Sequence, residues 1–147
     1  MKILVLNGPN LNLLGIREPA LYGNRTYADL ERFIADTAAG LGRDVTVEVR
    51  QSNHEGVLVV WIQSARGIFD GIVLNAAAYT HTSVAILDAL KAVAIRTVEV
   101  HLTEPKAREP FRRVSYVGMV AEKTCSGRGF ESYADALRYL VDTQGRA

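Results

Sequence analysis

The sequence predicts a single α/β domain in which helices cover both faces of an open parallel sheet. Three observations lead to this prediction. The chain has 147 residues, 48% of them hydrophobic, which is enough for one core and too little for two domains. Short apolar runs of strand length alternate along the chain with stretches of helical periodicity. No repeat or low-complexity linker interrupts this alternation.

The first predicted strand is the continuous apolar run from Ile3 to Asn7. It is followed by Gly8-Pro9-Asn10, which cannot prolong a strand. We expect a loop from there to about Arg25, and connections of this length in compact domains are commonly lids or binding loops. This loop is the first place to look for function.

A helix is expected after the loop, because Thr26 and Asp29 have the spacing of a capping box and apolar residues recur at helical spacing until Gly42. The alternating valines of 45–49 then predict a second strand. Ser52 and Glu55 are expected to form a second capping pair, before a helix that includes 57–62 and ends by Gly67.

The third strand is predicted over 71–74, followed by a helix over 82–93, and the fourth strand over 96–101. After an arginine-rich loop, we expect the fifth strand over 116–121 and a last helix that begins at Ser132. Strands that alternate with helices form right-handed βαβ units, so the fold predicted is a flavodoxin-like three-layer sandwich with a five-stranded parallel sheet. We expect it to occupy residues 1–147 as one catalytic domain.

Composition narrows the partners and the compartment. The 17 basic and 16 acidic residues nearly cancel, which argues against nucleic acid or an anionic membrane surface as a partner. No apolar run has the roughly 18 to 20 residues that a membrane span needs. Cys125 is the only cysteine, and the start at Met1 runs directly into a strand instead of a signal peptide. These features predict a soluble, cytoplasmic protein.

In parallel α/β sheets, ligands bind outside the carboxyl ends of the strands. The polar residues expected at these ends include Asn7, Asn10, Ser52, Asn53, Asn75, His81 and His101. The glycine pattern of a dinucleotide site, the lysine of a P-loop and the G-x-S-x-G elbow of a hydrolase are all absent from the sequence. Cys125 has no matched base, His81, Glu99 and His101 do not have a known metal-ligand spacing, and the four lysines lie in solvated contexts. Acid–base chemistry without a metal or cofactor remains.

Two pairs of residues could perform such chemistry. Glu99 and His101 lie on the same face of a strand, where the carboxylate can fix one imidazole tautomer for a general acid. Tyr22 follows Arg17 by five residues in the first loop. A tyrosine with a pKa of about 10 becomes a useful base only with about 3 to 4 kcal/mol of phenolate stabilisation, which a guanidinium can supply. The alternatives are a packing or surface tyrosine and a histidine that satisfies backbone groups.

Five blocks of the sequence, in matching order, closely resemble the type II 3-dehydroquinate dehydratases. These blocks are Asn7-Gly8-Pro9-Asn10-Leu11-Asn12-Leu13-Leu14-Gly15; Arg17-Glu18-Pro19 with Tyr22-Gly23; Asn75 with Tyr79-Thr80-His81-Thr82-Ser83; Glu99-Val100-His101; and Ala107-Arg108-Glu109 with Phe111-Arg112. The resemblance implies a flavodoxin-like subunit of a homododecamer, a tetramer of trimers. It also implies a hydro-lyase that converts 3-dehydroquinate to 3-dehydroshikimate by anti elimination through an enolate, without metal or cofactor, in shikimate synthesis or quinate breakdown.

The resemblance also implies roles for individual residues. Tyr22 is the base, Arg17 stabilises its phenolate, and His101, paired with Glu99, is the acid. Asn10 lies near an ordered water that stabilises the enolate. The implied substrate contacts are Asn75 and His81 at hydroxyls, the Leu102-Thr103 backbone at the carboxylate, Arg112 at a ring hydroxyl, and Asp88 in the site of a neighbouring subunit.

Taken without the resemblance, several of these residues have simpler interpretations. Asp88 and Arg112 could be solvated surface charges, and Asn75 and His81 could cap the helix beside them. Leu102, Thr103, the stretch 104–106 and the stretch 125–130 also depart from the common form of the family. A non-catalytic module that binds flavin or is phosphorylated is a further alternative, but a phosphorylated receiver needs an acidic cluster where this chain has Asn and His.

Overall fold

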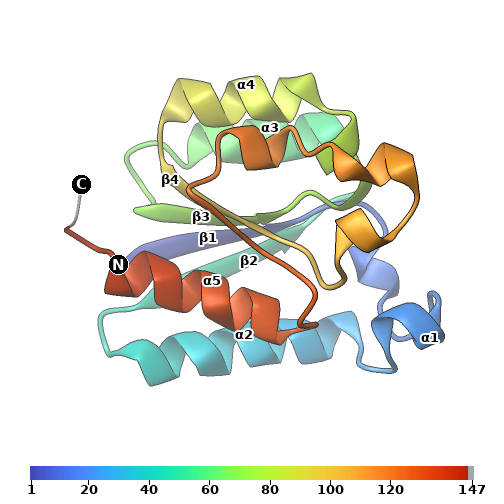
Figure 1. The fold of residues 1–147 in the computed structure, drawn as a ribbon. Helices are drawn as coiled ribbons and strands as arrows, with labels where there is room; N and C mark the ends of the chain where they lie inside the picture. Colours follow the sequence, from blue (N-terminus) through green and yellow to red (C-terminus); the bar gives the residue numbers. More distant parts are fainter. Residues whose placement is uncertain (146–147) are drawn as a thin grey trace.

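The computed structural model describes residues 1–145 and contains a five-stranded sheet between two pairs of helices (Figure 1). The strands are β1 (Lys2–Asn7), β2 (Thr46–Gln51), β3 (Gly71–Asn75), β4 (Arg96–Val100) and β5 (Lys123–Cys125). The main helices are α2 (Tyr27–Leu41), α3 (Glu55–Ser64), α4 (Val84–Val93) and α5 (Glu131–Asp142), and the short α1 is Pro19–Tyr22. The predicted domain also includes residues 146 and 147, which lie outside the described residues.

All strand pairs are parallel, and the order in the sheet is β2-β1-β3-β4-β5. This is the flavodoxin-like order, so the predicted fold class is confirmed. In Figure 1, α2 and α5 cover one face of the sheet, and α3 and α4 cover the other. Among the described residues, no helix is both long and apolar enough to cross a membrane.

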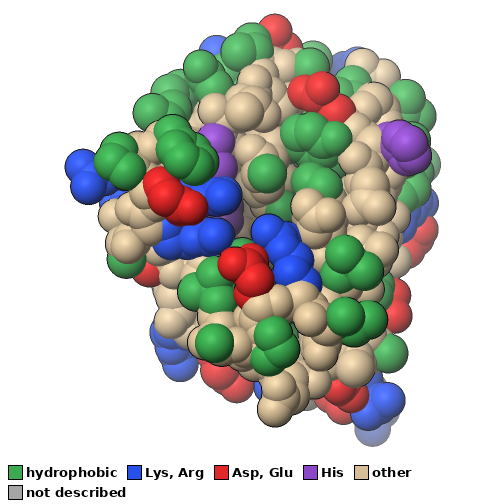
Figure 2. Space-filling model, turned by 90° about the vertical axis from the view of Figure 1, so that its right-hand side faces the viewer, with side chains coloured by type: hydrophobic (Ala, Val, Ile, Leu, Met, Phe, Trp, Pro, Cys, Tyr) green, Lys and Arg blue, Asp and Glu red, His purple; other side chains and the backbone are tan. Residues whose placement is uncertain are grey.

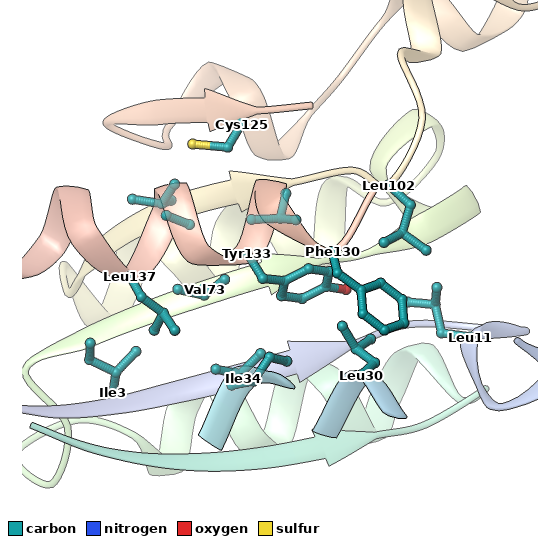
Figure 3. Packing of buried hydrophobic residues seen from close by; sticks show 14 of the residues in the cluster. Ile3, Leu11, Leu30, Ile34, Val73, Leu102, Cys125, Phe130, Tyr133 and Leu137 are labelled. Carbon is teal, nitrogen blue, oxygen red and sulfur yellow. The ribbon is translucent and has the colours of Figure 1, made fainter. Parts of the chain in front are cut away.

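The central strands β1, β3 and β4 are buried on both faces, which gives the molecule two hydrophobic clusters. Ile3 and Val5 of β1 pack in the cluster beneath α2 and α5, whereas Leu4 and Leu6 pack in the cluster beneath α3 and α4. Alternate residues of a strand point to opposite faces, so a strand covered on both sides has to be a continuous apolar run. This explains why β1 and β3 were recognisable from the sequence. Figure 3 shows the first cluster around Tyr133, Phe130 and Leu137.

Two capping pairs were predicted at helix starts; the structure confirms the first pair and contradicts the second. Thr26 and Asp29 form the predicted capping box at the start of α2, and Gly42 follows its last turn. The second predicted capping pair is wrong. The N-cap of α3 is His54, without a side-chain cap, and the Ser52 hydroxyl instead accepts a hydrogen bond from the backbone N–H of His54. A local turn between neighbouring residues satisfies Ser52 before the helix begins.

The predicted fifth strand over 116–121 is also wrong, since β5 begins at Lys123. Residues 117–119 form a 3₁₀ turn, and the backbone N–H groups of Val120 and Ala121 both bond to the Val117 carbonyl. The fully buried Val117 and the partly buried Val120 pack into the cluster beneath α3 and α4, so these two residues fill a corner of the core instead of a sheet position. The true edge strand has only three residues and no apolar pattern.

The loops that leave β1 and β3 touch at the carboxyl end of the sheet. The Gly8 N–H donates to the Asn75 carbonyl at 2.8 Å, and a Cβ on Gly8 would lie 2.5 Å from the Ala76 carbonyl oxygen. Only glycine allows this close approach. The contact brings Asn10 and Asn75, which follow different strands, to one side of the molecule.

Candidate active site

A cavity opens at the carboxyl ends of β1, β3 and β4, where the fold predicts a ligand site. Figure 2 views the molecule from this end and shows histidine (purple) and basic side chains (blue) beside a hollow; the basic residues that line the cavity are Arg17, Arg108 and Arg112. The cavity brings together most of the site residues predicted from sequence: Asn10, Arg17, Tyr22, Asn75, His81, His101, Leu102, Thr103 and Arg112. Glu99 lies behind His101 and lines a neighbouring hollow.

His101 is held on the floor of the cavity by a buried ion pair with Glu99. The His101 Nε2 atom lies 2.8 Å from Glu99 Oε1, and these residues are 7% and 1% exposed. Because an ionised carboxylate can only accept, Nε2 carries a proton, and Nδ1 is the ring nitrogen left for chemistry. The predicted Glu99–His101 pair is therefore present, in a geometry that fixes the imidazole tautomer.

The Glu99 carboxylate is surrounded by donors from other segments of the chain. Besides His101, Glu99 accepts hydrogen bonds from Thr80 Oγ1 at 2.6 Å, from Thr124 Oγ1 at 2.8 Å and from the Ser115 hydroxyl. Burial raises the pKa of this carboxyl, but the hydrogen bond and charge of His101, together with the Ser115 and Thr80 hydroxyls, outweigh burial and lower the pKa to about 2. A Cβ on Gly118 would lie 2.8 Å from Glu99 Oε2, so a side chain there would displace the carboxylate.

Backbone donors lie beside His101. Within residues 1–145, the N–H groups of Leu102 and Thr103 donate to no other group of the chain, although both residues line the cavity. Two adjacent unpaired N–H groups form a binding position for an anionic oxygen.

Across the cavity, His81 Nδ1 lies 2.7 Å from the Val114 carbonyl oxygen. Since a carbonyl only accepts, Nδ1 carries a proton and Nε2 is left for a ligand.

The two asparagines of the cavity are each fixed from outside it. Asn10 has the left-handed conformation, with φ 68°, and its N–H donates to the Asn53 side chain at 2.9 Å. Asn75 is 3% exposed and bonds through both ends of its amide, to Tyr133 and to the backbone N–H of Ala77. Neither asparagine caps a helix with its side chain.

Tyr22 is at the end of α1 in the first loop, residues 8–25, and contacts two arginines. The Arg17 Cζ atom lies 5.4 Å from the centre of the Tyr22 ring, so this guanidinium lies over the ring face. Arg108 Nη1 donates to the Tyr22 hydroxyl at 3.0 Å. Arg17 also pairs with Glu18 at 3.4 Å. Two arginines therefore lie beside Tyr22, Arg17 at the ring and Arg108 at the hydroxyl; the sequence pointed only to Arg17, and Arg108 supplies the hydrogen bond.

Comparison with known proteins shows to which family this chain belongs. The family Dehydroquinase class II matches residues 1–141, nearly the whole chain. The chain belongs to the class II dehydroquinase family. The resemblance inferred from the sequence is thereby confirmed, and the family consists of hydro-lyases of the shikimate pathway.

Individual relatives of this dehydroquinase agree along the whole chain. The 3-dehydroquinate dehydratase 2 of Pseudomonas putida is 52% identical over 140 residues, which are 95% of this chain and 93% of that one. The 3-dehydroquinate dehydratase of Phenylobacterium zucineum is 55% identical over 135 residues, or 92% of each chain. The crystal structure of the type II dehydroquinase from Butyrivibrio crossotus has a TM-score of 0.91 at 45% identity and covers 95% of this chain and 97% of that chain.

Sequence reasoning about this dehydroquinase missed residues that line the cavity or lie behind its wall. Arg108 was noted only as part of a motif, although it lines the cavity and contacts Tyr22. Thr80, Ser115 and Thr124 have no local signal, because they meet Glu99 only through tertiary folding. Asp88 is exposed on α4 and does not line the cavity of its own chain. Among the described residues, no group of three or more His, Cys, Asp or Glu side chains is placed to hold a metal ion.

Proposed function

We propose that this class II dehydroquinase removes water from 3-dehydroquinate to give 3-dehydroshikimate, with Tyr22 as base and His101 as acid. The observation that carries the proposal is a tyrosine hydroxyl beside Arg108 and a buried His101–Glu99 pair that share one cavity at the strand ends. The proposed chemistry uses side chains, backbone N–H groups and an ordered water, and needs no metal or cofactor. The reaction belongs to shikimate synthesis or to quinate breakdown.

The first step is removal of a proton from the carbon beside the ketone. The Tyr22 phenolate takes this proton, and the electron pair of the C–H bond moves toward the ketone oxygen to form an enolate. Arg17 over the ring and Arg108 at the hydroxyl each place a permanent positive charge beside this side chain. An ordered water near Asn10 is proposed to donate to the enolate oxygen, where negative charge develops.

The second step is loss of the hydroxyl group. The enolate electrons form the carbon–carbon double bond while the C–O bond breaks, and His101 gives its Nδ1 proton to the departing oxygen, so that water leaves. The Glu99 carboxylate stabilises the imidazolium that carries this proton. An anti elimination requires base and acid on opposite faces of the ring, which suits a base on the first loop and an acid on the floor.

The remaining residues of the cavity are proposed to orient the substrate. The free N–H groups of Leu102 and Thr103 are suited to the substrate carboxylate, and Asn75 and His81 to its hydroxyls. Arg112 lines the same cavity and is held by Glu109 through a 2.7 Å bond, which orients its guanidinium toward a ring hydroxyl. Because Leu102 and Thr103 act through backbone groups, their departure from the common residues of the family leaves this role unchanged.

We also propose a cytoplasmic homododecamer, a tetramer of trimers, in which Asp88 completes the site of a neighbouring subunit. Asp88 is exposed on α4 and does not line its own cavity, so a role in catalysis requires a second chain. Native mass measurement should give the mass of twelve chains. Asp88→Asn should lower kcat without changing that mass, and a stable, fully active monomer would contradict the proposal.

Addition of 3-dehydroquinate to the purified protein tests the reaction itself. The product contains a conjugated enone, so its ultraviolet absorption should grow with time and in proportion to enzyme concentration. Prior treatment with EDTA and dialysis should leave the rate unchanged, because no metal is involved. Heat-denatured protein is the matched control. The absence of an enone band at high enzyme concentration would contradict the proposed function.

A further inference from the structure

A chain of hydrogen bonds runs beneath the cavity between residues that are remote in sequence. The Tyr133 hydroxyl accepts from Asn75 Nδ2 at 2.8 Å and donates to Asn7 Oδ1 at 2.6 Å. Tyr133 and Asn7 are 0% exposed and Asn75 is 3% exposed. A buried hydroxyl is costly unless it is hydrogen bonded, and a phenylalanine would fill the same space without that requirement. The hydroxyl of Tyr133 therefore calls for an explanation beyond packing.

The direction of this chain is fixed at its Ala77 end. The backbone N–H of Ala77 can only donate, so the Asn75 atom 3.2 Å from it is Oδ1, and Nδ2 faces Tyr133. At the other end, Asn7 Nδ2 donates to the Tyr27 hydroxyl at 3.3 Å, which leaves Oδ1 to accept from Tyr133. Burial raises the pKa of Tyr133 above its ordinary value, so its hydroxyl keeps its proton and stays a donor.

The chain ends at the cavity wall, since Asn75 and Ala77 both line the cavity. After its bonds to Tyr133 and Ala77, Asn75 retains one N–H and one lone pair of its amide for a ligand. We propose that Tyr133 is a positioning residue: its hydroxyl fixes the amide of Asn75 so that the remaining hydrogen-bonding groups meet a hydroxyl of the substrate. This inference rests on the proposed function, for which Asn75 is a substrate contact.

The ring and the hydroxyl of Tyr133 have separate roles. Figure 3 shows the ring among Phe130, Leu137 and Val73 in the cluster beneath α2 and α5, where any aromatic side chain of this size would pack. The hydroxyl reaches the ends of β1 and β3, which carry Asn7 and Asn75. Tyr133→Phe keeps the ring and removes only the hydrogen bonds, so it separates positioning from packing.

The test is a double-mutant cycle that combines Tyr133→Phe with Asn75→Ala, measured by steady-state kinetics on 3-dehydroquinate. In the wild-type background, Tyr133→Phe should lower kcat/KM about tenfold, mainly through a higher KM, which is the effect of one misplaced hydrogen bond. In the Asn75→Ala background, the same substitution should change kcat/KM less than twofold. A role limited to packing would lower kcat/KM by the same factor in both backgrounds.

The controls distinguish the possible failures. Tyr139→Phe removes a hydroxyl from the same helix, outside the cavity, and should leave kcat/KM unchanged. If Tyr133→Phe does not fold, Asn7→Leu can be used, because it removes the acceptor of the Tyr133 hydroxyl. It should also raise KM, by a smaller factor than Tyr133→Phe. If the wild-type enzyme is active and both Tyr133→Phe and Asn7→Leu leave kcat/KM unchanged, this inference alone is overturned. An inactive wild-type enzyme would overturn the proposed function and this inference together.

Discussion

Beneath the floor of the cavity, the Glu99 carboxylate accepts hydrogen bonds from four side chains and is 1% exposed, whereas the Tyr22 hydroxyl on the first loop has one hydrogen-bond partner, Arg108. The floor is formed by the buried side chains of Asn75 and His101 at the ends of β3 and β4, with Glu99 behind His101. The first loop instead carries Tyr22 on a four-residue helix bounded by Glu18 and Gly23, both with positive φ.

The difference shows how one cavity can hold an acid and a base in different surroundings. A buried carboxylate and imidazole need many donors, because an unpaired charge in the core is costly. The floor therefore couples catalysis to stability. Tyr22 and the arginines beside it, Arg17 and Arg108, are half-buried, so water still reaches them and no such network is needed. Loss of Tyr22 should therefore cost activity without costing stability.

The largest effect is expected from Tyr22→Phe, which removes the base. We expect kcat to fall by about 10³-fold, in the range of general-base catalysis, with little change in substrate affinity or in the free energy of unfolding. Stopped-time assays and urea denaturation measure the two quantities. Tyr116→Phe, which removes a hydroxyl outside the cavity, is the matched control. A near-wild-type rate for Tyr22→Phe would refute its assignment as the base.

Glu99→Gln should damage both activity and stability. The neutral amide no longer stabilises the imidazolium of His101, so kcat should fall by about 10²-fold. Removing one partner of a buried ion pair should also lower the free energy of unfolding at neutral pH by about 3 kcal/mol. If activity fell while stability stayed at the wild-type value, the coupling of the floor to the fold would be wrong.

The stabilising effect of the ionised Glu99 carboxylate should also appear in the pH dependence of the free energy of unfolding. The pKa of Glu99 is lowered to about 2 in the folded protein, against about 4.3 for an unfolded glutamate, so its contribution is fully present above about pH 4.3. It should be lost as the pH falls toward about 2, by about 3 kcal/mol. Urea denaturation from pH 6 to pH 2 measures this loss. The difference between wild type and Glu99→Gln should shrink over that window, and a constant difference would contradict the prediction.

Smaller effects are expected on the first loop from Arg17→Gln and Arg108→Gln. Each removes one of the two positive charges beside Tyr22, so each should lower kcat by about 30-fold with the free energy of unfolding nearly unchanged. Arg113→Gln, an exposed arginine outside this cavity, is the control and should remain active. Wild-type kcat in Arg108→Gln would mean that its hydrogen bond to Tyr22 has no part in the reaction.

Local patterns carried the prediction of the fold. The continuous apolar runs of β1 and β3 and the capping box of Thr26 and Asp29 are set by neighbouring residues, so they could be recognised in the chain. The edge strand could not, because β5 has only three residues and its neighbour Val117 is apolar for a different reason, burial beneath α4. A side chain that satisfies a turn, as Ser52 does, likewise imitates a cap.

The sequence by itself determined the fold class, the location of the site at the strand ends, and the predicted pairing of Glu99 with His101, because residues two apart on a strand share a face. Only the tertiary structure decided what surrounds them. Thr80 and Thr124 reach Glu99, Arg108 reaches Tyr22 across 86 positions, and Tyr133 reaches Asn7 across 126. Such contacts depend on how sheet and helices pack, and no local spacing encodes them.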